Sequence, residues 1–485
     1  LVAPGATFTL EGSGSGYHTY QLVYNPNTQL SDLYVDGIKR IQNKADLIYN
    51  AAVEGGSRAI YSVAWGGENG GQVNFNFVQL TIGSVNFTAP GLTQMSQTCA
   101  VQGSTFNVTF TGTNLATVNA VVSDNPGVSG SIISRSDTSV TAIITIAPQA
   151  ATGATTLGLT TLGGTAKMPF NISPAQFAYV TNYGSNTVSI IATATNTVVA
   201  TVPVGANPVG VAITPDGAFA YVANYSSNTV SVIATATNTV AATVPVGLNP
   251  WGVTITPNGA FVYVTNYGSN TVSVITTATN TIVATVPVGA NPASVAITSD
   301  GTFAYIANYG SNTVSVIATA ANTVVATVPV GPNPWGVAIR PDGAFAYVTI
   351  TGSGWNQRYV AVIATATNTL VGGVGLPWSG YANPAGAAIS PNGVFAYVTN
   401  NAFAAGLNYH TVEVIATATN AVVATVPLGG HPLALSVTPD GKFVYVANAG
   451  YNIVSVIATA TNTVVATVPV GGSPVWVAFT PMVVP

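Results

Sequence analysis

The feature that most constrains this chain is a tyrosine that recurs seven times in its last two thirds. Its copies, separated by 42, 42, 42, 42, 50 and 48 residues, are Tyr179, Tyr221, Tyr263, Tyr305, Tyr347, Tyr397 and Tyr445. Around each copy, four short stretches rich in Val, Ile, Thr and Tyr alternate with turn signals such as Pro215 to Gly217. This pattern predicts an antiparallel meander of four strands. No segment has the periodicity of a helix.

A repeat of this length predicts a β-propeller. A period of about 40 to 45 residues with four strands per copy is typical of propeller blades, because only neighbouring blades can cover both apolar faces of each sheet. The first copy lacks an innermost strand, whereas residues 473–480 form a strand with no partner of its own. We therefore expect residues 473–480 to pair inside blade 1 and to close seven blades over residues 174–485, which removes open sheet edges.

Charge is scarce in this chain. Only 5% of its residues are charged and its net charge is -4, whereas ordinary soluble proteins have about 25% charged residues. The sequence therefore offers no basic surface for nucleic acid and little charge repulsion against self-association. Mean hydropathy is +0.46, yet no run of 18 apolar residues predicts a membrane span. Cys99 is the single cysteine, so no internal disulfide is expected.

The repeated motifs resemble those of one family. Tyr-Val-Thr-Asn or Tyr-Val-Ala-Asn, the turn Thr-Pro-Asp-Gly and the run Asn-Thr-Val-Ser-Val-Ile-Ala-Thr-Ala-Thr-Asn-Thr are similar to the YVTN family of β-propellers, over residues 177–485. That family is found in archaeal surface-layer proteins and in exported bacterial proteins. The resemblance implies a fold and a cell-surface setting, and it implies no reaction.

Two small β-sandwich domains are predicted before the propeller. Residues 1–88 resemble the later half of a laminin-G or concanavalin-like jelly roll, through a His-Thr-Tyr strand and the hairpin Leu33 to Ile38. They are too few for the usual sandwich of about 12 strands, so its first half is missing or another chain supplies it. Residues 89–173 alternate as six or seven strands and are similar to immunoglobulin-like domains of the IPT/TIG type, which serve as spacers or adhesive stalks. The overall class is all-β.

Catalytic chemistry is not predicted. Four acids of the propeller, Asp216, Asp300, Asp342 and Asp440, occupy the same repeated hairpin turn, and turn chemistry explains them. His410 and His431 are its only histidines, so haem, copper or zinc sites cannot be assembled from this inventory. We expect no cofactor, no metal and no enzyme. The residues before the inner-strand prolines, expected around a water-filled channel mouth, are Asn207, Asn249, Asn291, Asn333, Asn383, His431 and Ser473.

Breaks in the repeat predict a binding patch. Blade 5 has extra residues within Thr351 to Tyr359 and within Gly372 to Ala382, and blade 6 has them between Asn400 and His410. In an up-and-down meander these loops emerge on one face, where aromatic side chains suit sugar rings or a protein partner. The candidate residues are Trp355, Arg358, Tyr359, Trp378, Tyr381, Phe403, Tyr409, His410, Trp335 and Trp251. Alternatively, these aromatics pack the loops themselves.

The predicted function is that of an exported structural protein, extracellular or on the cell surface, which forms a surface layer or another assembly with copies of itself. Its numbering starts at Leu1 without a signal peptide, so a signal has been removed or a longer precursor precedes it. A carbohydrate-binding adhesin that uses the aromatic patch on a polysaccharide or glycan is the alternative. A propeller lyase that uses His410 is a second alternative, which the few acids and bases disfavour.

Overall fold

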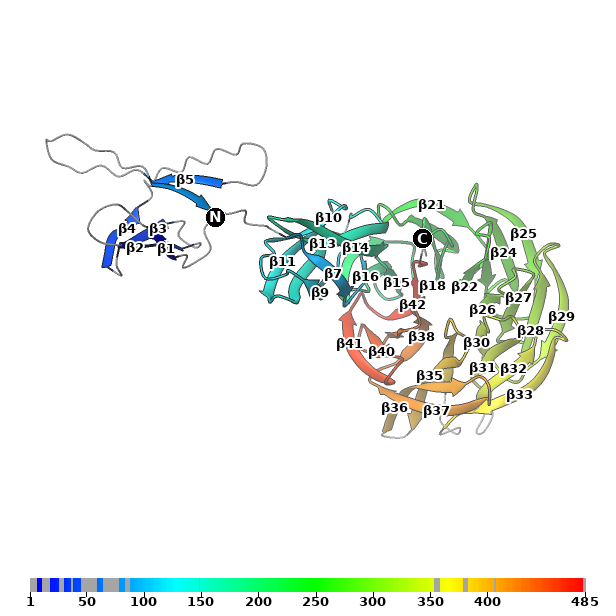
Figure 1. Ribbon diagram of the computed structural model, residues 1–485. Helices are drawn as coiled ribbons and strands as arrows, with labels where there is room; N and C mark the ends of the chain where they lie inside the picture. Colours follow the sequence, from blue (N-terminus) through cyan, green and yellow to red (C-terminus); the bar gives the residue numbers. More distant parts are fainter. Residues whose placement is uncertain are drawn as a thin grey trace. The chain divides into compact units, whose positions relative to one another are not determined.

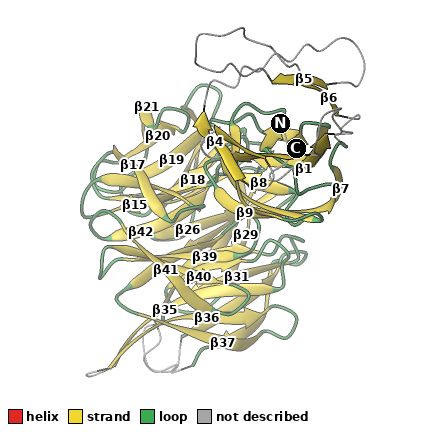
Figure 2. Ribbon diagram, turned by 60° about the vertical axis from the view of Figure 1, so that its left-hand side comes forward, coloured by secondary structure: helices red, strands yellow, loops and turns green. Residues whose placement is uncertain are grey.

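The structure is a computed structural model in which every described element is a β-strand (Figure 2). It describes the backbone of six strands within residues 1–87, and residues 88–147, 149–352, 358–377, 383–404 and 407–482; side chains are described for 88–147, 149–352, 358–377, 383–401 and 410–482. The chain forms two compact units, Leu1–Ala89 with Thr161–Gly164, and Pro90–Thr160 with Thr165–Pro485. Among the described residues, no helix is long and apolar enough to cross a membrane.

The first unit contains a four-stranded meander and a separate pair of strands. The meander, in the order β1-β2-β3-β4, consists of β1 (Thr7–Leu10), β2 (His18–Asn25), β3 (Leu30–Val35) and β4 (Ile38–Lys44). The pair consists of β5 (Ala59–Val63) and β6 (Val78–Ile82), which are antiparallel. Side chains of this unit up to residue 87 lie outside the described residues.

Two four-stranded sheets form the segment before the propeller. One has the order β10-β13-β14-β8 and the other β11-β12-β9-β7. Their strands are β7 (Gly91–Met95), β8 (Cys99–Val101), β9 (Thr105–Thr113), β10 (Ala120–Ser123), β11 (Val128–Arg135), β12 (Ser139–Ile146), β13 (Gly153–Thr161) and β14 (Gly164–Ser173). Alternate residues of these strands, Phe110, Ile144 and Leu157 among them, are fully buried in a core of their own.

Seven four-stranded sheets form the propeller (Figure 1), so the predicted all-β fold with seven blades is confirmed. Blade 1 contains β15 (Phe177–Asn182), β16 (Thr187–Ala192), β17 (Thr197–Pro203) and the last strand, β42 (Pro474–Phe479). Blade 2 contains β18 (Pro208–Ile213), β19 (Phe219–Asn224), β20 (Thr229–Ala234) and β21 (Thr239–Pro245). Blade 3 contains β22 (Pro250–Ile255), β23 (Phe261–Asn266), β24 (Thr271–Thr276) and β25 (Thr281–Pro287).

The other four blades repeat this order from the channel outward. Blade 4 contains β26 (Pro292–Ile297), β27 (Phe303–Asn308), β28 (Thr313–Ala318) and β29 (Thr323–Pro329). Blade 5 contains β30 (Pro334–Ile339), β31 (Phe345–Ile350), β32 (Tyr359–Ala364) and β33 (Thr369–Gly375). Blade 6 contains β34 (Pro384–Ile389), β35 (Phe395–Ala404), β36 (Leu407–Ala416) and β37 (Ala421–Leu428), and blade 7 contains β38 (Pro432–Val437), β39 (Phe443–Asn448), β40 (Ile453–Ala458) and β41 (Thr463–Pro469).

The ring is closed by the C-terminal strand. In blade 1, β42 pairs antiparallel with β15, so that Tyr179 lies opposite Ala478. The seam between the last blade and the first also carries a hydrogen bond, in which the Tyr445 hydroxyl donates to the Asn196 side-chain oxygen. Main-chain pairing and a side-chain bond therefore both join the two ends of the propeller.

The seven repeated tyrosines are core residues, and most of them also join neighbouring blades. All seven are at most 1% exposed. The Tyr221 hydroxyl donates to Oδ1 of Asn280 in the next blade at 2.6 Å, an arrangement that recurs at five other blade seams. The acceptor asparagines have φ near +55° in tight turns, a conformation that asparagine tolerates better than most residues. No such bond joins Tyr397 to Asn462, whose buried Oδ1 has no partner among the described residues.

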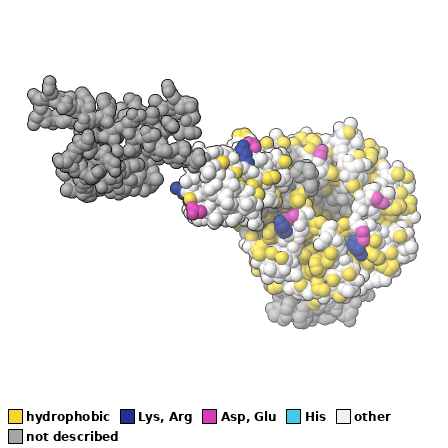
Figure 3. All heavy atoms as spheres, viewed as in Figure 1, with side chains coloured by type: hydrophobic (Ala, Val, Ile, Leu, Met, Phe, Trp, Pro, Cys, Tyr) yellow, Lys and Arg dark blue, Asp and Glu magenta, His cyan; other side chains and the backbone are white. Residues whose placement is uncertain are grey.

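The outermost strand of each blade presents an apolar but irregular edge. In six of the blades a single valine bulges out of this strand and is 52% to 56% exposed; these residues are Val199, Val283, Val325, Val371, Val423 and Val465. The outermost strand ends at a proline in five of the seven blades, for example Pro203 in β17, and has a proline one residue before its end in blade 6. Bulges and prolines hinder the pairing of a further strand. These edges are therefore protected against strand addition without charged side chains. Charged side chains are indeed isolated spots on the visible surface (Figure 3).

Candidate functional site

The inner strands place one side chain per blade at the mouth of the central channel. Each begins with a buried proline, and its ladder to the second strand has a bulge directly after that proline. Trp251 in β22 and Trp335 in β30 occupy the position after the proline and are half-buried. Since a bulge redirects the side chains at its position, it aims both indoles into the mouth.

Threonine hydroxyls brace the bulges that carry both indoles. Thr265 Oγ1 accepts a hydrogen bond from the Gly252 amide at 2.8 Å and donates to the Ala293 carbonyl of the next blade at 2.8 Å. Thr349 does the same between the Gly336 amide and the Ala385 carbonyl. Both threonines are fully buried. They therefore fix the peptide next to each tryptophan and tie neighbouring inner strands together.

Three tyrosines approach the two indoles from neighbouring loops. Tyr225, Tyr267 and Tyr309 directly follow β19, β23 and β27, on the face where the inner strands begin. Asparagines before the inner-strand prolines hold these loops: Asn249 donates from Nδ2 to the Tyr225 carbonyl, and Asn291 to the Tyr267 carbonyl. These asparagines, expected at an open channel mouth, therefore link neighbouring blades and position aromatic residues.

The five rings form one continuous group, which we call the aromatic arc: Tyr225, Trp251, Tyr267, Tyr309 and Trp335. Trp251 and Trp335 meet edge to face with centroids 5.1 Å apart. Tyr225 contacts Trp251 at 5.5 Å, Tyr309 contacts Trp335 at 5.3 Å, and Tyr267 lies between the two halves at 6.0 Å from Trp251 and 6.4 Å from Tyr309. Edge-to-face pairs at such distances are favourable, so the arc is held in place by its own contacts.

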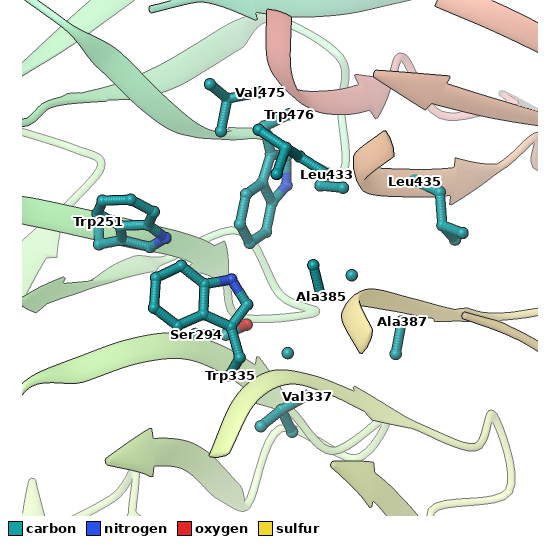
Figure 4. A pocket seen from close by; sticks show the side chains of 13 residues that line it. Trp251, Ser294, Trp335, Val337, Ala385, Ala387, Leu433, Leu435, Val475 and Trp476 are labelled. Atoms are coloured by element: carbon teal, nitrogen blue, oxygen red, sulfur yellow. The ribbon is translucent and has the colours of Figure 1, made fainter. Parts of the chain in front are cut away.

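The arc borders a cavity of about 60 Å³ on the propeller axis. Trp251, Trp335 and Trp476 converge on this space (Figure 4). The opposite wall is aliphatic, with Ala385, Leu433 and Val475 at the positions that follow the prolines of blades 6, 7 and 1. The site therefore has one aromatic wall and one aliphatic wall.

The site is uncharged. None of the cavity-lining residues is an acid, a base or a histidine. Burial, followed by the nearby Tyr309 and Tyr225, raises the pKa of Tyr267 above its usual value, so its hydroxyl stays protonated at neutral pH. The described residues of the chain contain no group of three or more His, Cys, Asp or Glu that could hold a metal. A ligand bound in this cavity would therefore contact aromatic ring faces, apolar groups and neutral hydrogen-bonding groups.

The structure brings together only part of the predicted patch. Trp251 and Trp335 meet in the aromatic arc. Arg358 instead donates from Nε to the Thr351 carbonyl, and the Tyr359 hydroxyl donates to the Val330 carbonyl, so both side chains brace blade 5. Trp355, Trp378 and Tyr381 lie outside the described residues, as do the side chains of Phe403 and Tyr409.

His410 lies apart from the aromatic arc. Its ring lies 5.1 Å from that of His431, between blades 6 and 7. Burial and the neighbouring His431 lower the pKa of His410. His410 is only 4% exposed, so it belongs to the packing of this seam.

Sequence reasoning missed five residues of the site, namely Tyr225, Tyr267, Tyr309, Ser294 and Trp476. The tyrosines belong to the repeated Asn-Tyr motif, so no single copy of the repeat marks them as site residues. Their place after the second strand predicts the same face as Trp251, so a signal was present. Trp476 stands where the other inner strands have Gly, Ser or Ala, a departure that an alignment of the seven copies reveals.

These features define a seven-bladed β-propeller with an uncharged, partly aromatic pocket at its channel mouth. Residues 238–329, which include Trp251, Tyr267 and Tyr309, match the model of a family described as Lactonase, 7-bladed beta-propeller. No curated protein matches the chain.

Solved structures share the fold. Hydrazine synthase of Kuenenia stuttgartiensis is similar with a TM-score of 0.52 and 25% identity, over 55% of this chain and 87% of that one. A functionally unknown protein of Desulfotomaculum acetoxidans is similar with a TM-score of 0.53 and 20% identity, over 63% of this chain and 99% of that one.

The expectation that this chain is not an enzyme is wrong in the light of these matches. The family model is that of a lactonase, and the Kuenenia relative is an enzyme by its name. The scarcity of acids and bases suggested a purely structural propeller. That inference considered redox propellers and a propeller lyase and set them aside on the residue inventory, which is not enough to exclude an enzyme.

Proposed function

We propose that this protein is an exported, extracellular surface protein whose propeller binds a neutral carbohydrate at the aromatic arc. The observation that carries the proposal is the contact of five aromatic rings around an uncharged axial cavity. Pockets of this kind, mostly apolar with a few convergent polar groups, are the usual form of a small-molecule site.

The chemistry of the arc suits a sugar. Ring faces pack against the apolar faces of pyranose rings, while the hydroxyls of Tyr225, Tyr267 and Tyr309 and the indole N–H groups are available for sugar hydroxyls, because no hydrogen bond occupies them among the described residues. Tyr and Trp combine an apolar body with a polar end, which makes them common in binding sites. A charged ligand would lose its hydration here without gaining a countercharge.

The finer family assignments belong to the same proposal. The Tyr-Val-Thr-Asn repeats support a propeller of the YVTN type in a cell-surface setting. The two-sheet segment over residues 89–173 supports an immunoglobulin-like spacer of the IPT/TIG type. Residues 1–88 would be a lectin-like jelly roll that is partial or completed by another chain, and a second glycan site on this unit would favour adhesion.

Binding to a glycan array, followed by calorimetry, tests the proposal. We expect Trp251→Ala combined with Trp335→Ala to abolish measurable binding, because hot-spot aromatics typically contribute about 2 kcal/mol or more each. Tyr451→Ala is the matched control, since Tyr451 is 62% exposed outside the arc. Unchanged binding in the double variant would refute the site.

The same samples serve to test catalysis. Because the matched family is a lactonase family, hydrolysis of a panel of lactones should be followed by pH-stat titration. Turnover that disappears with the double tryptophan variant and persists with Tyr451→Ala would assign the reaction to this mouth.

Self-assembly into a surface layer is a second candidate, favoured by the exposed valines on the outer strands. An assembly through side-chain contacts of these strands, without further strand pairing, would bury Val199 and its counterparts against a second copy of the chain. Electron microscopy of the purified protein should then show sheets or filaments, and replacing the six bulged valines by threonine should disperse them. Monomers at high concentration would remove this candidate.

A further inference from the structure

The third position of the inner strands is not the same residue in every blade. The third residue of each inner strand lines the axis, and in chain order these residues are Gly210, Gly252, Ser294, Gly336, Gly386, Ala434 and Trp476. Ser294 is the only polar residue in this ring and Trp476 is the only large one. Both line the axial cavity.

Ser294 places a hydroxyl on the wall of the cavity. The residue is only 4% exposed, and among the described residues its Oγ makes no hydrogen bond with the protein. Polar groups that line an otherwise apolar pocket orient a ligand by hydrogen bonding. Ser294 lines the cavity beside Trp335 (Figure 4). A bound group with a hydrogen-bond acceptor would satisfy it.

The size of the cavity limits what can enter. Its volume is about 60 Å³, whereas a cavity that holds a benzene ring measures about 150 Å³. The space therefore accepts a substituent, and the ring that carries it must stay above, on the aromatic arc. Trp476 sets this limit, because it fills the axis where the other blades have Gly, Ser or Ala.

The walls specify the chemistry of the substituent. Leu433, Val475 and Ala385 offer an apolar surface opposite the indoles, and Ser294 offers one neutral hydroxyl. A carboxylate or an ammonium group would be desolvated there without a countercharge. A hydroxymethyl group would meet the hydroxyl and leave the aliphatic wall without an apolar partner. An acetamido group has a carbonyl for Ser294 and a methyl group for the aliphatic wall.

We propose that the axial cavity binds the acetamido group of an N-acetylated hexosamine, with the Ser294 hydroxyl donating to its carbonyl oxygen and its methyl group against Leu433 and Val475. This inference rests on the proposed carbohydrate-binding function and narrows its ligand class. The sugar ring stacks on the aromatic arc, and Trp476 forms the floor that stops it from entering the channel. The site thereby selects an N-acetylated sugar through contacts with its acetamido group.

Calorimetry with three matched probes tests the proposal: tetramers of N-acetylglucosamine, glucosamine and glucose, all β-1,4-linked. We expect the N-acetylated tetramer to bind at least tenfold more tightly than the other two. Ser294→Ala should weaken its binding about fivefold, which is the worth of one hydrogen bond of about 1 kcal/mol. The glucose tetramer should bind this variant as it binds the unaltered protein.

The fold should survive the substitution, because blade 7 has Ala434 at the same position; the melting temperature checks this. Trp476→Ala gives an independent readout, since a deeper cavity should cost at least fivefold in selectivity between the N-acetylated and the glucose tetramers. Equal binding of these two tetramers by the unaltered protein would overturn the acetamido assignment and leave carbohydrate binding standing. Binding of none of the probes, nor of any glycan on the array, would overturn both.

Discussion

The two halves of the channel mouth share a backbone and differ in chemistry. In blades 2 to 5 the mouth carries Tyr225, Trp251, Tyr267, Tyr309 and Trp335 in mutual contact, whereas blades 6, 7 and 1 present Ala385, Leu433 and Val475. Every inner strand nevertheless starts with a buried proline. The comparison shows that the repeated residues form the ring. The site is formed by residues that face the channel mouth and that differ from blade to blade.

The interior of blade 6 also differs from that of the regular blades. In blades 1 to 4 a buried asparagine such as Asn266 donates to a serine on the third strand, here Ser273, at 2.9 Å. Blade 6 has Glu413 in place of that serine, fully buried, and its carboxylate accepts from Thr411 at 2.7 Å and from Thr425 at 2.6 Å. A buried carboxylate is costly unless hydrogen bonds compensate. Blade 6, which belongs to the aliphatic half, thus has a less regular core than blades 1 to 4.

The largest expected effect contrasts the two walls of the mouth. Trp335→Ala should weaken glycan binding about 30-fold, as expected for a hot-spot aromatic worth roughly 2 kcal/mol. Leu433→Ala removes a comparable wall residue from the aliphatic side and should cost less than threefold. Calorimetric titration measures both. Equal losses of affinity would mean that the aromatic and aliphatic walls contribute equally to binding, which would contradict the proposed difference between them.

Glu413 offers the next largest effect. Glu413→Ala should lower the free energy of unfolding by about 2 kcal/mol, because Thr411 and Thr425 lose the acceptor of their hydrogen bonds. Glu413→Ser restores the residue of the regular blades and should cost less than about 0.5 kcal/mol, because it removes a buried charge. Denaturant titration compares the two variants. A larger loss with serine than with alanine would contradict this account of blade 6.

The blade seams provide a third comparison. Tyr445→Phe removes the hydroxyl that donates to Asn196 and should destabilise the propeller by about 1 kcal/mol. Tyr397→Phe removes a hydroxyl that makes no such bond to Asn462 and should cost a few tenths of a kcal/mol. The difference between their melting temperatures is the measurement. Identical shifts would show that the seam bonds carry no net stability.

The smallest expected effect concerns acid stability. The hydrogen bonds from the Thr214 hydroxyl and the Ala218 amide lower the pKa of Asp216. A lowered folded-state pKa gives stability that is present above the unfolded value of about 3.9 and is lost as pH falls through the folded value. Asp216→Asn copies Asn258 of blade 3 and removes this titration, so the variant should melt slightly below the unaltered protein at pH 7 and at the same temperature in acid, below the folded value. An equal loss at both pH values would contradict the assignment.

The fold was largely predictable, because each of its determinants occurs many times. Seven buried tyrosines at nearly constant spacing, with turns such as Pro215 to Gly217 between strands, predicted an all-β propeller of seven blades. The bonds between the tyrosines and the asparagines of the next blade were not foreseen. One copy of the repeat contains both residues, but only the ring places them opposite each other.

The site was less predictable, because it is assembled from residues that occur once. Trp251 and Trp335 were predicted to extend the aromatic patch, whereas Ser294 and Trp476 were not singled out. Their importance depends on what the other six blades contribute to the same axial level. That information lies in the comparison of copies about 42 residues apart and in the closure of the ring.

Ring closure also determines how long blade 1 remains incomplete during synthesis of the chain. Asn182 of β15 pairs opposite Pro474 of β42, so nearly 300 residues must be synthesised between the two partners. At about 5 to 20 residues per second this takes roughly 15 to 60 s. For that interval the inner edge of blade 1, Phe177–Asn182, has no charge and no strand beside it. Until β42 is synthesised, the nascent chain is therefore prone to aggregation through this edge, and a chaperone that covers the edge would protect it.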